Sequence, residues 1–318
     1  MAWDWSHALL GVVYAVPAAG LALVDPAQGL AAAVGMIPAA AAGLAGPRRA
    51  RLATAVVGAL AGVSMLVGSL LTQVPILAVP AIFLLCVGVA VVAPRGKLGR
   101  IALGLCLPLV GLGLSYDDPR ETVGIALLMT LGSLYAFVVS LAWPARPVAQ
   151  PVSAARAGGR AMLGYGILLG LAAAIAAAIG FRLQLDHVGW ACGAALLVMR
   201  PAPELARLRG TDRVVSVFLG AAAGSGLVLL DPAPAVIAAA LVVALAGMAG
   251  THGSLRYVTP LFTTFLVFLL LLIDNPQDVQ GRFLERMGET ALGVGLALLF
   301  GVLVPMIIPR VATNRRAS

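Results

Sequence analysis

The chain has 318 residues, of which 61% are hydrophobic and only 11% are charged, and its mean hydropathy is +1.02. Because about a quarter of the residues in soluble proteins are charged, this composition excludes a soluble globular protein. The net charge of +8 is spread over many short polar breaks, so it indicates membrane orientation and argues against a nucleic-acid-binding stripe.

Apolar stretches of roughly the length that crosses a bilayer follow one another along the chain. The start of the sequence lacks the basic region of a secretory signal, so we expect the first stretch to remain as a membrane helix. The predicted fold class is an all-α integral membrane protein with about twelve transmembrane helices. The expected spans are residues 8–24, 29–46, 52–72, 75–93, 98–115, 121–142, 161–181, 187–200, 213–230, 233–250, 256–273 and 286–309.

The basic residues alternate along the chain between breaks that hold many and breaks that hold few. All but four of the 21 Lys and Arg residues fall in the even-numbered breaks or at the C-terminus, the exceptions being Arg120, Arg182, Arg282 and Arg286. Loops that remain in the cytoplasm carry an excess of Lys and Arg. We therefore expect a multi-pass protein of the inner (cell) membrane with both termini in the cytoplasm.

The two halves of the chain share several landmarks in the same order. An aspartate (Asp25, Asp186) precedes an arginine, and the arginine opens the pattern Arg-x6-Gly-x3-Gly in each half. The members of this pattern are Arg51, Gly58 and Gly62 in the first half and Arg213, Gly220 and Gly224 in the second. We predict two parallel six-helix repeats, at residues 1–145 and 161–318, joined by a cytoplasmic linker at 146–160. Chance similarity in an Ala- and Leu-rich chain is the alternative.

The sequence predicts no cofactor, no metal site and no catalytic residues. The three cysteines lie inside apolar spans, where they behave as small buried side chains, and no cluster has metal-ligand spacing. The chain also lacks the glycine-rich loop that binds nucleotide phosphates. We therefore do not expect an enzyme.

The eighth expected span is too short to cross the hydrocarbon alone. It runs from His187 to Met199, about 20 Å of helix, and is flanked by Asp186 and Arg200. A short span at matching positions of two halves points to a transporter's binding site, since the second span is also short and is interrupted by Pro38. The alternative is a tilted bundle whose polar ends reach the interface.

Charged residues near the spans favour an anionic cargo. Arg213, Arg286 and Glu289 are the best placed, because a guanidinium drawn into a membrane normally faces a cavity or a partner and recognises carboxylates. Arg213 as an inner-face anchor and Arg286 paired with Glu289 along the helix remain open as structural alternatives. Tyr257 and the nearby threonines of the eleventh span either line the path or bond back to their own helix.

Several of these residues resemble the motifs of a known family. They are His187, Trp190, Arg200, Pro201, Arg213, Gly220, Arg286, Thr290 and Gly293. Over roughly residues 160–310 the chain resembles the membrane domain of the fusaric acid resistance and aromatic acid exporter family, which looks related to the fold of the aluminium-activated malate transporters. Ser216 and Val217 stand where that family usually has Gly-Thr, and the first half follows the pattern in outline only.

The resemblance implies movement of organic anions, and we expect efflux of aromatic or carboxylate anions. An anion channel of the malate-transporter type and a membrane scaffold without cargo are the alternatives. The expected partners are a small organic anion and the lipid bilayer, with no nucleic acid, and a homo-oligomer is left open. The sequence does not decide the identity of the substrate or whether transport is coupled to protons.

Overall fold

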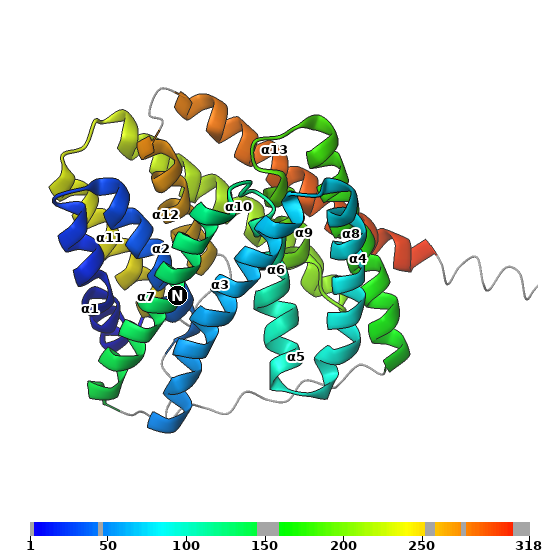
Figure 1. The fold of residues 1–318 in the computed structure, drawn as a ribbon, viewed down its shortest axis with the longest axis horizontal. Helices are drawn as coiled ribbons and strands as arrows, with labels where there is room; N and C mark the ends of the chain where they lie inside the picture. The colour runs from blue at the N-terminus through cyan, green and yellow to red at the C-terminus, as the bar shows by residue number, and fades with distance from the viewer. Residues whose placement is uncertain (1–2, 44–46, 145–158, 252–257, 275–277, 308–318) are drawn as a thin grey trace, which may run out of the picture. The chain divides into compact units, whose positions relative to one another are not determined.

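The computed structural model describes residues 3–43, 47–144, 159–251, 258–274 and 278–307. These ranges form helices joined by short connections, with no strand among them (Figure 1). Seven of the helices are long and apolar enough to cross a membrane: α1 (Trp5–Ala22), α3 (Leu52–Thr72) with the 3-10 turn η1 (Arg48–Arg51), α4 (Pro75–Val92) with η2 (Ala93–Arg95), α7 (Pro119–Ala142), α8 (Gly159–Leu183), α10 (Pro203–Leu229) and α13 (Val279–Leu298). The protein is therefore a multi-pass helical membrane protein, as its composition predicts.

The remaining expected spans are shorter or irregular helices. Four are short and apolar: α2 (Pro26–Ala42), α9 (Val188–Val198), α11 (Pro234–Gly250) and α12 (Val258–Asp274). The fifth combines α5 (Lys97–Ile101), the π-helical turn η3 (Ala102–Cys106) and α6 (Leu107–Gly113). A second π-helical turn, η5 (Leu299–Leu303), follows α13. Each of the twelve expected spans thus coincides with a helical segment.

Local sequence explains where many of these helices begin. Proline occupies the first helical position of α2, α4, α7, α10 and α11, where its missing N–H costs nothing and its fixed φ suits the helix. Aspartates cap the first two helices: Asp4 accepts hydrogen bonds from the backbone N–H groups of Ser6 and His7, and Asp25 accepts one from that of Gln28.

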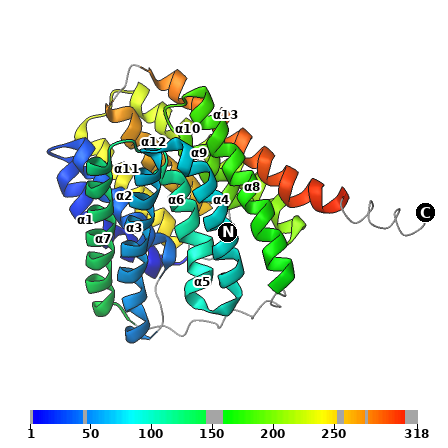
Figure 2. The same ribbon diagram turned by 45° about the vertical axis from the view of Figure 1, so that its right-hand side comes forward.

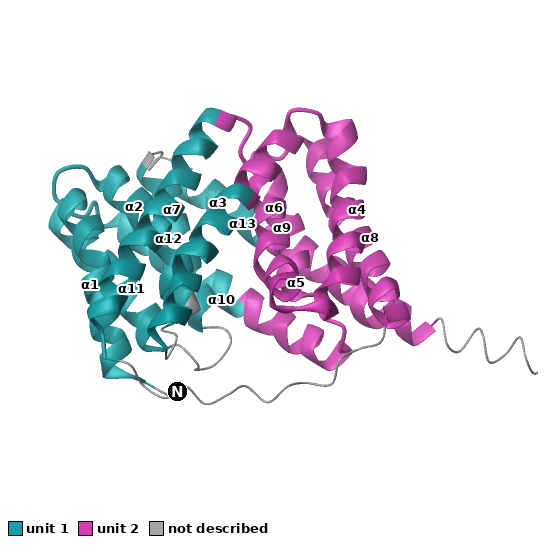
Figure 3. Cartoon of the chain, turned by 60° about the horizontal axis from the view of Figure 1, so that its bottom comes forward, with its two compact units in different colours: residues 1–63, 120–152, 215–287 teal, residues 64–119, 153–214, 288–318 magenta. Residues whose placement is uncertain are grey.

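The helices form two compact units, shown in different colours in Figure 3. Unit 1 contains residues 1–63, 120–152 and 215–287, and unit 2 contains residues 64–119, 153–214 and 288–318. Three long helices, α3, α10 and α13, contribute one part to each unit. The units therefore do not coincide with the two halves of the sequence, because each takes segments from both.

Several helix pairs of unit 1 have counterparts in unit 2, although α2 also packs against α11 and the corresponding pair, α9 and α4, is not packed in this way. In unit 1, α1 packs against α2 and α11, and α2 also packs against α12. In unit 2, α8 packs against α9 and α4, and α9 also packs against α6. Counted along each half of the sequence, α1 and α8 are first spans, α2 and α9 second, α11 and α4 fourth, and α12 and α6 fifth. Each unit thus joins the first two spans of one half to the fourth and fifth spans of the other.

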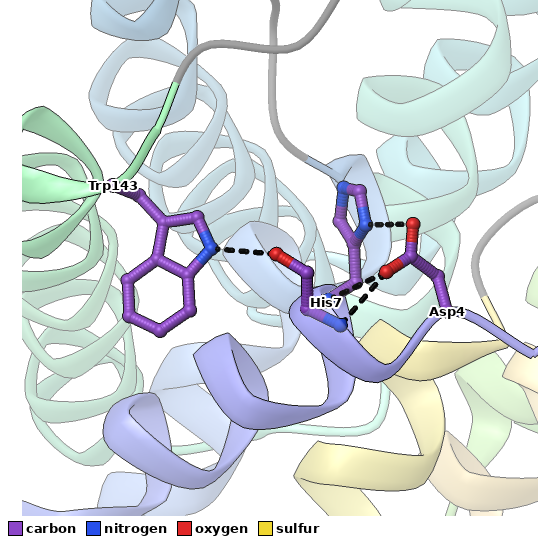
Figure 4. Close-up of polar contacts among 4 residues, drawn as sticks. Asp4, His7 and Trp143 are labelled. Carbon is purple, nitrogen blue, oxygen red and sulfur yellow. Dashed lines mark hydrogen bonds and ion pairs between the residues drawn. The ribbon is translucent and has the colours of Figure 1, made fainter.

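Several segments that the charge pattern places on the same side of the membrane meet at one end of unit 1. At one end of unit 1, the Asp4 N–H donates to the Gly250 carbonyl and Arg51 donates to the carbonyls of Ser140 and Trp143. Trp143 also reaches the start of α1, where its indole N–H donates to Ser6 Oγ beside the Asp4–His7 pair (Figure 4). These contacts hold the start of α1 to the end of α7 and to Gly250.

Candidate functional site

The family-like motif of the last span occupies the buried face of α13. Arg286, Glu289, Thr290 and Gly293 follow one another at spacings of three, one and three residues, which places them on one side of a helix. The three polar side chains are only 5%, 4% and 3% exposed, whereas Leu284 on the opposite side is 60% exposed. The charged residues of this motif therefore point into the protein and away from its surface. Arg286 lies on the part of α13 that belongs to unit 1, and the other three lie in unit 2.

The structure corrects the expected starts of two spans. The ninth span begins at Pro203 instead of residue 213, and the last begins at Val279 instead of residue 286. In both cases a charged helical segment resembles a loop in a hydropathy profile. Arg207, Arg209 and Arg213 therefore lie on α10 and not in a connecting loop.

Arg213 lies deep along α10. It follows Pro203 by ten residues, which is about 15 Å of helix. It shares the buried stripe of α10 with Ala206, Gly210 and Val217, since these positions recur at helical spacing and all three are buried. An arginine anchoring the inner interface would lie near the beginning of the helix, so its position favours a role inside the protein.

The short span is α9, whose eleven residues are nearly all buried. His187 occupies its N-cap position and stacks on Trp190, with ring centroids 4.0 Å apart and ring planes at 18°. The first turn of α9 is fixed to the turn that follows α6 by a hydrogen bond from the Gly189 N–H to Ser115 Oγ at 3.0 Å. Asp186, immediately before, is exposed. The N-terminal end of α9 therefore presents a half-buried imidazole on a buried indole.

Arg200 lies at the other end of α9, where it caps the helix. Its Nη1 donates to the carbonyls of Leu196 and Met199, at 3.3 and 2.7 Å, and the Tyr165 hydroxyl also donates to Met199 at 3.1 Å. A cation at a helix C-terminus is stabilised by the helix dipole, so Arg200 has a structural role whatever else it binds.

Close contacts at two glycines establish which residues of unit 2 lie at the same level. A Cβ on Gly293 would lie 2.7 Å from Ala194 Cβ and against the Ala191 carbonyl, so α13 meets α9 there. Because these two helices run in the same direction, one turn earlier on each places Glu289 level with His187. A Cβ on Gly210 would lie 3.2 Å from Val294 Cγ1, so α10 meets α13 there. Along the helix axes of unit 2, Arg200 therefore lies at one end, Arg213 follows, and Glu289 and His187 lie furthest from Arg200.

The other expected site residues divide into three groups. Tyr257 lies outside the described residues. The Thr263 hydroxyl bonds back to the Thr259 carbonyl of its own helix at 3.1 Å, as the structural alternative predicts. The glycines of the paired motif each face a neighbouring helix: Gly58 and Gly62 face α7, and Gly220 and Gly224 face α12.

Sequence reasoning missed Tyr165, and it placed Arg209 in a loop. Tyr165 on α8 is 7% exposed, and its hydroxyl donates to the same Met199 carbonyl as Arg200. Proline at a first helical position followed by an acid, as in Pro203-Glu204, is a helix-start signal that would have placed Arg209 on a helix. No comparable signal marks Tyr165. Within the described residues, no group of three His, Cys, Asp or Glu side chains could hold a metal ion.

The chain matches one family model, described as fusaric acid resistance protein-like, over residues 171–300. No curated protein and no solved structure shows a significant match to the chain. The matched segment is about two fifths of the chain and includes α9, α10 and α13 with the motif residues described above. This confirms the resemblance to the fusaric acid resistance family seen in the motifs, and the family is one of membrane transporters and not of enzymes. Residues 171–300 of this multi-pass membrane protein are therefore similar to the fusaric acid resistance protein-like family.

Proposed function

We propose that the protein exports organic anions, aromatic or carboxylate, across the inner membrane, with both of its termini in the cytoplasm. The family of the second half supports a transport function. The charges of unit 2 support the substrate class, and the membrane potential supports the direction.

One observation carries the proposal: Arg213 and Glu289 are ionisable residues well inside two long helices, and Glu289 is only 4% exposed. Each is the eleventh residue of its helix, in a helix of 27 residues for Arg213 and of 29 for Glu289. An arginine at the centre of a membrane helix costs about 2.5–3.5 kcal/mol on insertion scales. Residues that cost this much inside a membrane usually mark the path of a substrate or an ion.

The sign of the charge supports an anionic substrate. Arg200, Arg209 and Arg213 follow one another on the turn before α10 and along α10 itself, and a guanidinium binds a carboxylate through two parallel hydrogen bonds. Such a series attracts anions and repels cations. The family description, which refers to resistance to an acid, is compatible with this substrate class.

The membrane potential favours the outward direction. An anion that leaves a cell with a negative interior gains about 2.3 kcal/mol per charge for each 100 mV. Export of an anion therefore needs no direct use of ATP.

The matched packing of the two units supports the duplication of six spans. Two copies of one fold that exchange their fourth and fifth helices would produce the observed order of contacts in each unit. We propose that the repeats at 1–145 and 161–318 are related in this way.

Vesicles containing the purified full-length protein would test the proposal. They are loaded with benzoate or acetate, and the release of each acid is followed under an imposed potential. We expect saturable release of at least one acid, and Arg213→Gln should reduce it at least about tenfold, the loss expected for one charge-assisted hydrogen bond. Arg207→Gln is the matched control, since Arg207 lies on the same helix but is exposed.

The outcomes separate the three functions considered. Saturable release that requires Arg213 supports the exporter. Single-channel currents that reverse at the Nernst potential of the acid would identify an anion channel instead. No release of any acid from vesicles with correctly folded protein would leave a scaffold role and refute transport.

A further inference from the structure

Two spans of unit 2 are interrupted in the same way. The π-helical turn η3, between α5 and α6, contains Gly104, four residues before Pro108. The π-helical turn η5, after α13, contains Gly301, four residues before Pro305. Within the described helices, three other prolines lie beyond the first turn of a regular helix, and none has a glycine four residues before it: Pro17, Pro38 and Pro80. Single π turns inside helices are rare and occur often at functional sites.

Backbone hydrogen bonds are missing at η3. The Leu107 N–H donates to the Ala102 carbonyl and not to the Leu103 carbonyl, which it would reach in an α-helix. Pro108 has no N–H, so it cannot supply a π-helical bond to the Leu103 carbonyl either. The Leu103 carbonyl therefore has no donor in the backbone pattern of its own helix. A helix bends most easily at such a place.

The turn η5 repeats this arrangement. The Val304 N–H donates to the Leu299 carbonyl, and Pro305 has no N–H to donate. The Phe300 carbonyl is therefore the counterpart of the Leu103 carbonyl in η3. The two turns share one sequence motif and one defect in hydrogen bonding.

A proline kink in unit 1 is stabilised by a neighbouring helix, unlike these two turns. Pro17 of α1 leaves the Val13 carbonyl without its helical donor, and the Tyr135 hydroxyl of α7 donates to that carbonyl at 2.9 Å. Among the residues that the structure describes, no side chain donates to the carbonyl of Leu103 or of Phe300. The kink in α1 is therefore fixed, whereas η3 and η5 have no comparable bond to hold one conformation.

Packing does not explain the glycine of η3. Gly104 is exposed, and a Cβ at this position would have no other atom within 4 Å. A glycine that no neighbour requires suits a point at which the backbone changes conformation, because glycine is the least restricted residue in φ and ψ. Gly301 is more closely surrounded, since a Cβ there would lie 3.3 Å from Met199 Cγ.

Both turns lie towards the end of α9 that carries Arg200. The turn η5 contacts Met199, directly before Arg200. A Cβ on Gly193 of α9 would lie 3.6 Å from the Pro108 carbonyl oxygen, while Gly189, earlier on α9, meets later residues of α6. The two helices therefore run in opposite directions, and η3, which precedes Pro108, lies level with the last turn of α9. The charge pattern predicts that this end faces the cytoplasm.

The rest of α6 and of α13 is held tightly on α9. A Cβ on Gly189 of α9 would meet the Gly111 carbonyl of α6, and one on Gly293 of α13 would meet the Ala191 carbonyl of α9. On the other side of η3, α5 packs against η2 and the end of α4, where a Cβ on Gly99 would lie 2.8 Å from an α-carbon of η2. Figure 2 shows α5 at the end of α6, beside α4.

We propose that η3 and η5 are hinges at which α5 and the segment from Val304 onward bend relative to α9, opening and closing the end of unit 2 beside Arg200. The missing backbone bonds lower the cost of bending at each turn, and the close glycine contacts keep the remainder of α6 and α13 on α9. The inference rests on the proposed function for one point, that the opening admits cargo from the cytoplasm. The bending itself does not depend on transport.

The first test is Gly104→Ala, which adds a methyl group in open space. Because alanine favours a regular helical backbone, we expect the bent form to become about two- to fivefold rarer, and benzoate release from vesicles to slow by the same factor. The unfolding temperature should rise by about 1–2 °C. The matched control is Gly88→Ala, at an exposed helical glycine of α4 that also has open space and lies in no π turn. It should raise the unfolding temperature equally and leave release unchanged.

A second pair of variants tests η5. Pro305→Ala supplies the N–H group that the turn lacks, so it should also slow release. Pro80→Ala is the control, because Pro80 is exposed and lies within α4, where the helix is regular. Release by this control should equal that of the wild type.

Bending can be measured without transport, from the distance between two spin labels on the full-length protein. The native cysteines are replaced by serine in every sample, and labels are attached at the exposed positions Leu98 of α5 and Leu208 of α10. We expect a broad or double distribution of distances that Gly104→Ala narrows. Labels at Leu163 of α8 and Leu208 form the control pair, whose distribution Gly104→Ala should not change.

The hinge and the proposed function fail in different ways. An equally narrow distribution for the Leu98–Leu208 pair with and without Gly104→Ala would overturn the hinge at η3. Release that Gly104→Ala and Gly88→Ala slow equally, or that neither slows, would overturn its role as a gate. If the labels show bending that Gly104→Ala restricts but the wild type releases no acid, the hinge is supported while export, and with it the gate for cargo, is refuted.

Discussion

A methyl group added at Gly293 tests the close approach of α13 to α9 beside the candidate site. An alanine Cβ there would lie 2.7 Å from Ala194 Cβ and against the Ala191 carbonyl oxygen, and backbone cannot move aside as a flexible side chain can. Gly295, two residues later on the same helix, has open space around the corresponding position. The two glycines therefore differ in packing and not in helix position.

The expected effects have opposite signs. Replacing an open helical glycine by alanine gains about 0.5–1 kcal/mol of helix propensity, so Gly295→Ala should be stabilised slightly. At Gly293 the same gain is outweighed by overpacking, which costs about 1–3 kcal/mol when a core is forced apart. The two variants should differ by about 1–3 kcal/mol. At about 2 °C per kcal/mol for a chain of this size, this corresponds to roughly 2–6 °C in unfolding temperature.

The assay is thermal unfolding of the full chain in detergent, with release of benzoate from vesicles as a second readout. Gly293→Ala should unfold at a lower temperature than Gly295→Ala and release benzoate more slowly, because Glu289 and Thr290 lie one turn away on the same face of α13. If the two variants unfold at the same temperature, α13 and α9 do not meet at Gly293. The conclusion that Glu289 and His187 lie at the same height along the helix axes would then be wrong.

Three further predictions concern the end of unit 1 that holds Asp4 and Arg51, and the orientation of the chain. Arg51→Gln should destabilise the protein by about 1.5–3 kcal/mol, which is the value of hydrogen bonds from a charged donor. The control is Arg48→Gln, at an exposed position, which should not destabilise the protein. If the Arg51 variant unfolds as the wild type does, the hydrogen bonds from Arg51 to the end of α7 contribute nothing to stability. Asp4→Asn keeps an oxygen that can cap the helix but removes the negative charge at the helix N-terminus, worth about 0.3–1 kcal/mol, so it should lower the unfolding temperature at neutral pH. Burial opposes the ionised form of Asp4, but hydrogen bonds from His7 and Ser6 lower the pKa of this carboxyl below the ordinary 3.8. The ionised carboxylate therefore contributes to the stability of the protein above pH 3.8, and this contribution is lost as the pH falls further. At such low pH the wild type and the variant should have the same stability. The orientation can be tested with single cysteines at the exposed positions Ile76 and Leu98, after the three native cysteines are replaced. The cysteine at position 76 should react with an impermeant thiol reagent from outside the cell, and the one at position 98 only after the cells are opened. The reverse pattern of labelling would show that the orientation is inverted.

The sequence predicts the number and the order of the spans because the hydrophobic requirement of a bilayer acts on each helix separately. It also predicts the short α9, since the distance from Asp186 to Arg200 limits any helix between them. The starts of α10 and α13 are predicted too late, because their first turns carry Arg207, Arg209, Arg282 and Glu285 and helices do not end where the hydrocarbon ends.

The neighbours of each helix could not be predicted in the same way. Most spans are apolar on every side, so no amphipathic stripe identifies the face that meets another helix. Only the glycines and the rare buried charges indicate where a helix contacts another. Gly58 and Gly62 indicate that another helix lies close, but nothing in their spacing identifies α7 as that helix. The stacking of His187 on Trp190 and the position of Tyr165 likewise depend on tertiary contacts.

The mixed composition of the two units affects how the protein is made. The helix α1 packs against α11, which begins 212 residues after α1 ends. At a synthesis rate of about 5–20 residues per second, the ribosome needs roughly 10–40 s to deliver that partner. During this interval the newly inserted N-terminal helices must stay in the bilayer with their future contact faces covered by lipid or by a chaperone. Assembly of either unit is therefore a late, post-insertion event, and any mutation that slows it prolongs the exposure of the first helices to membrane proteases.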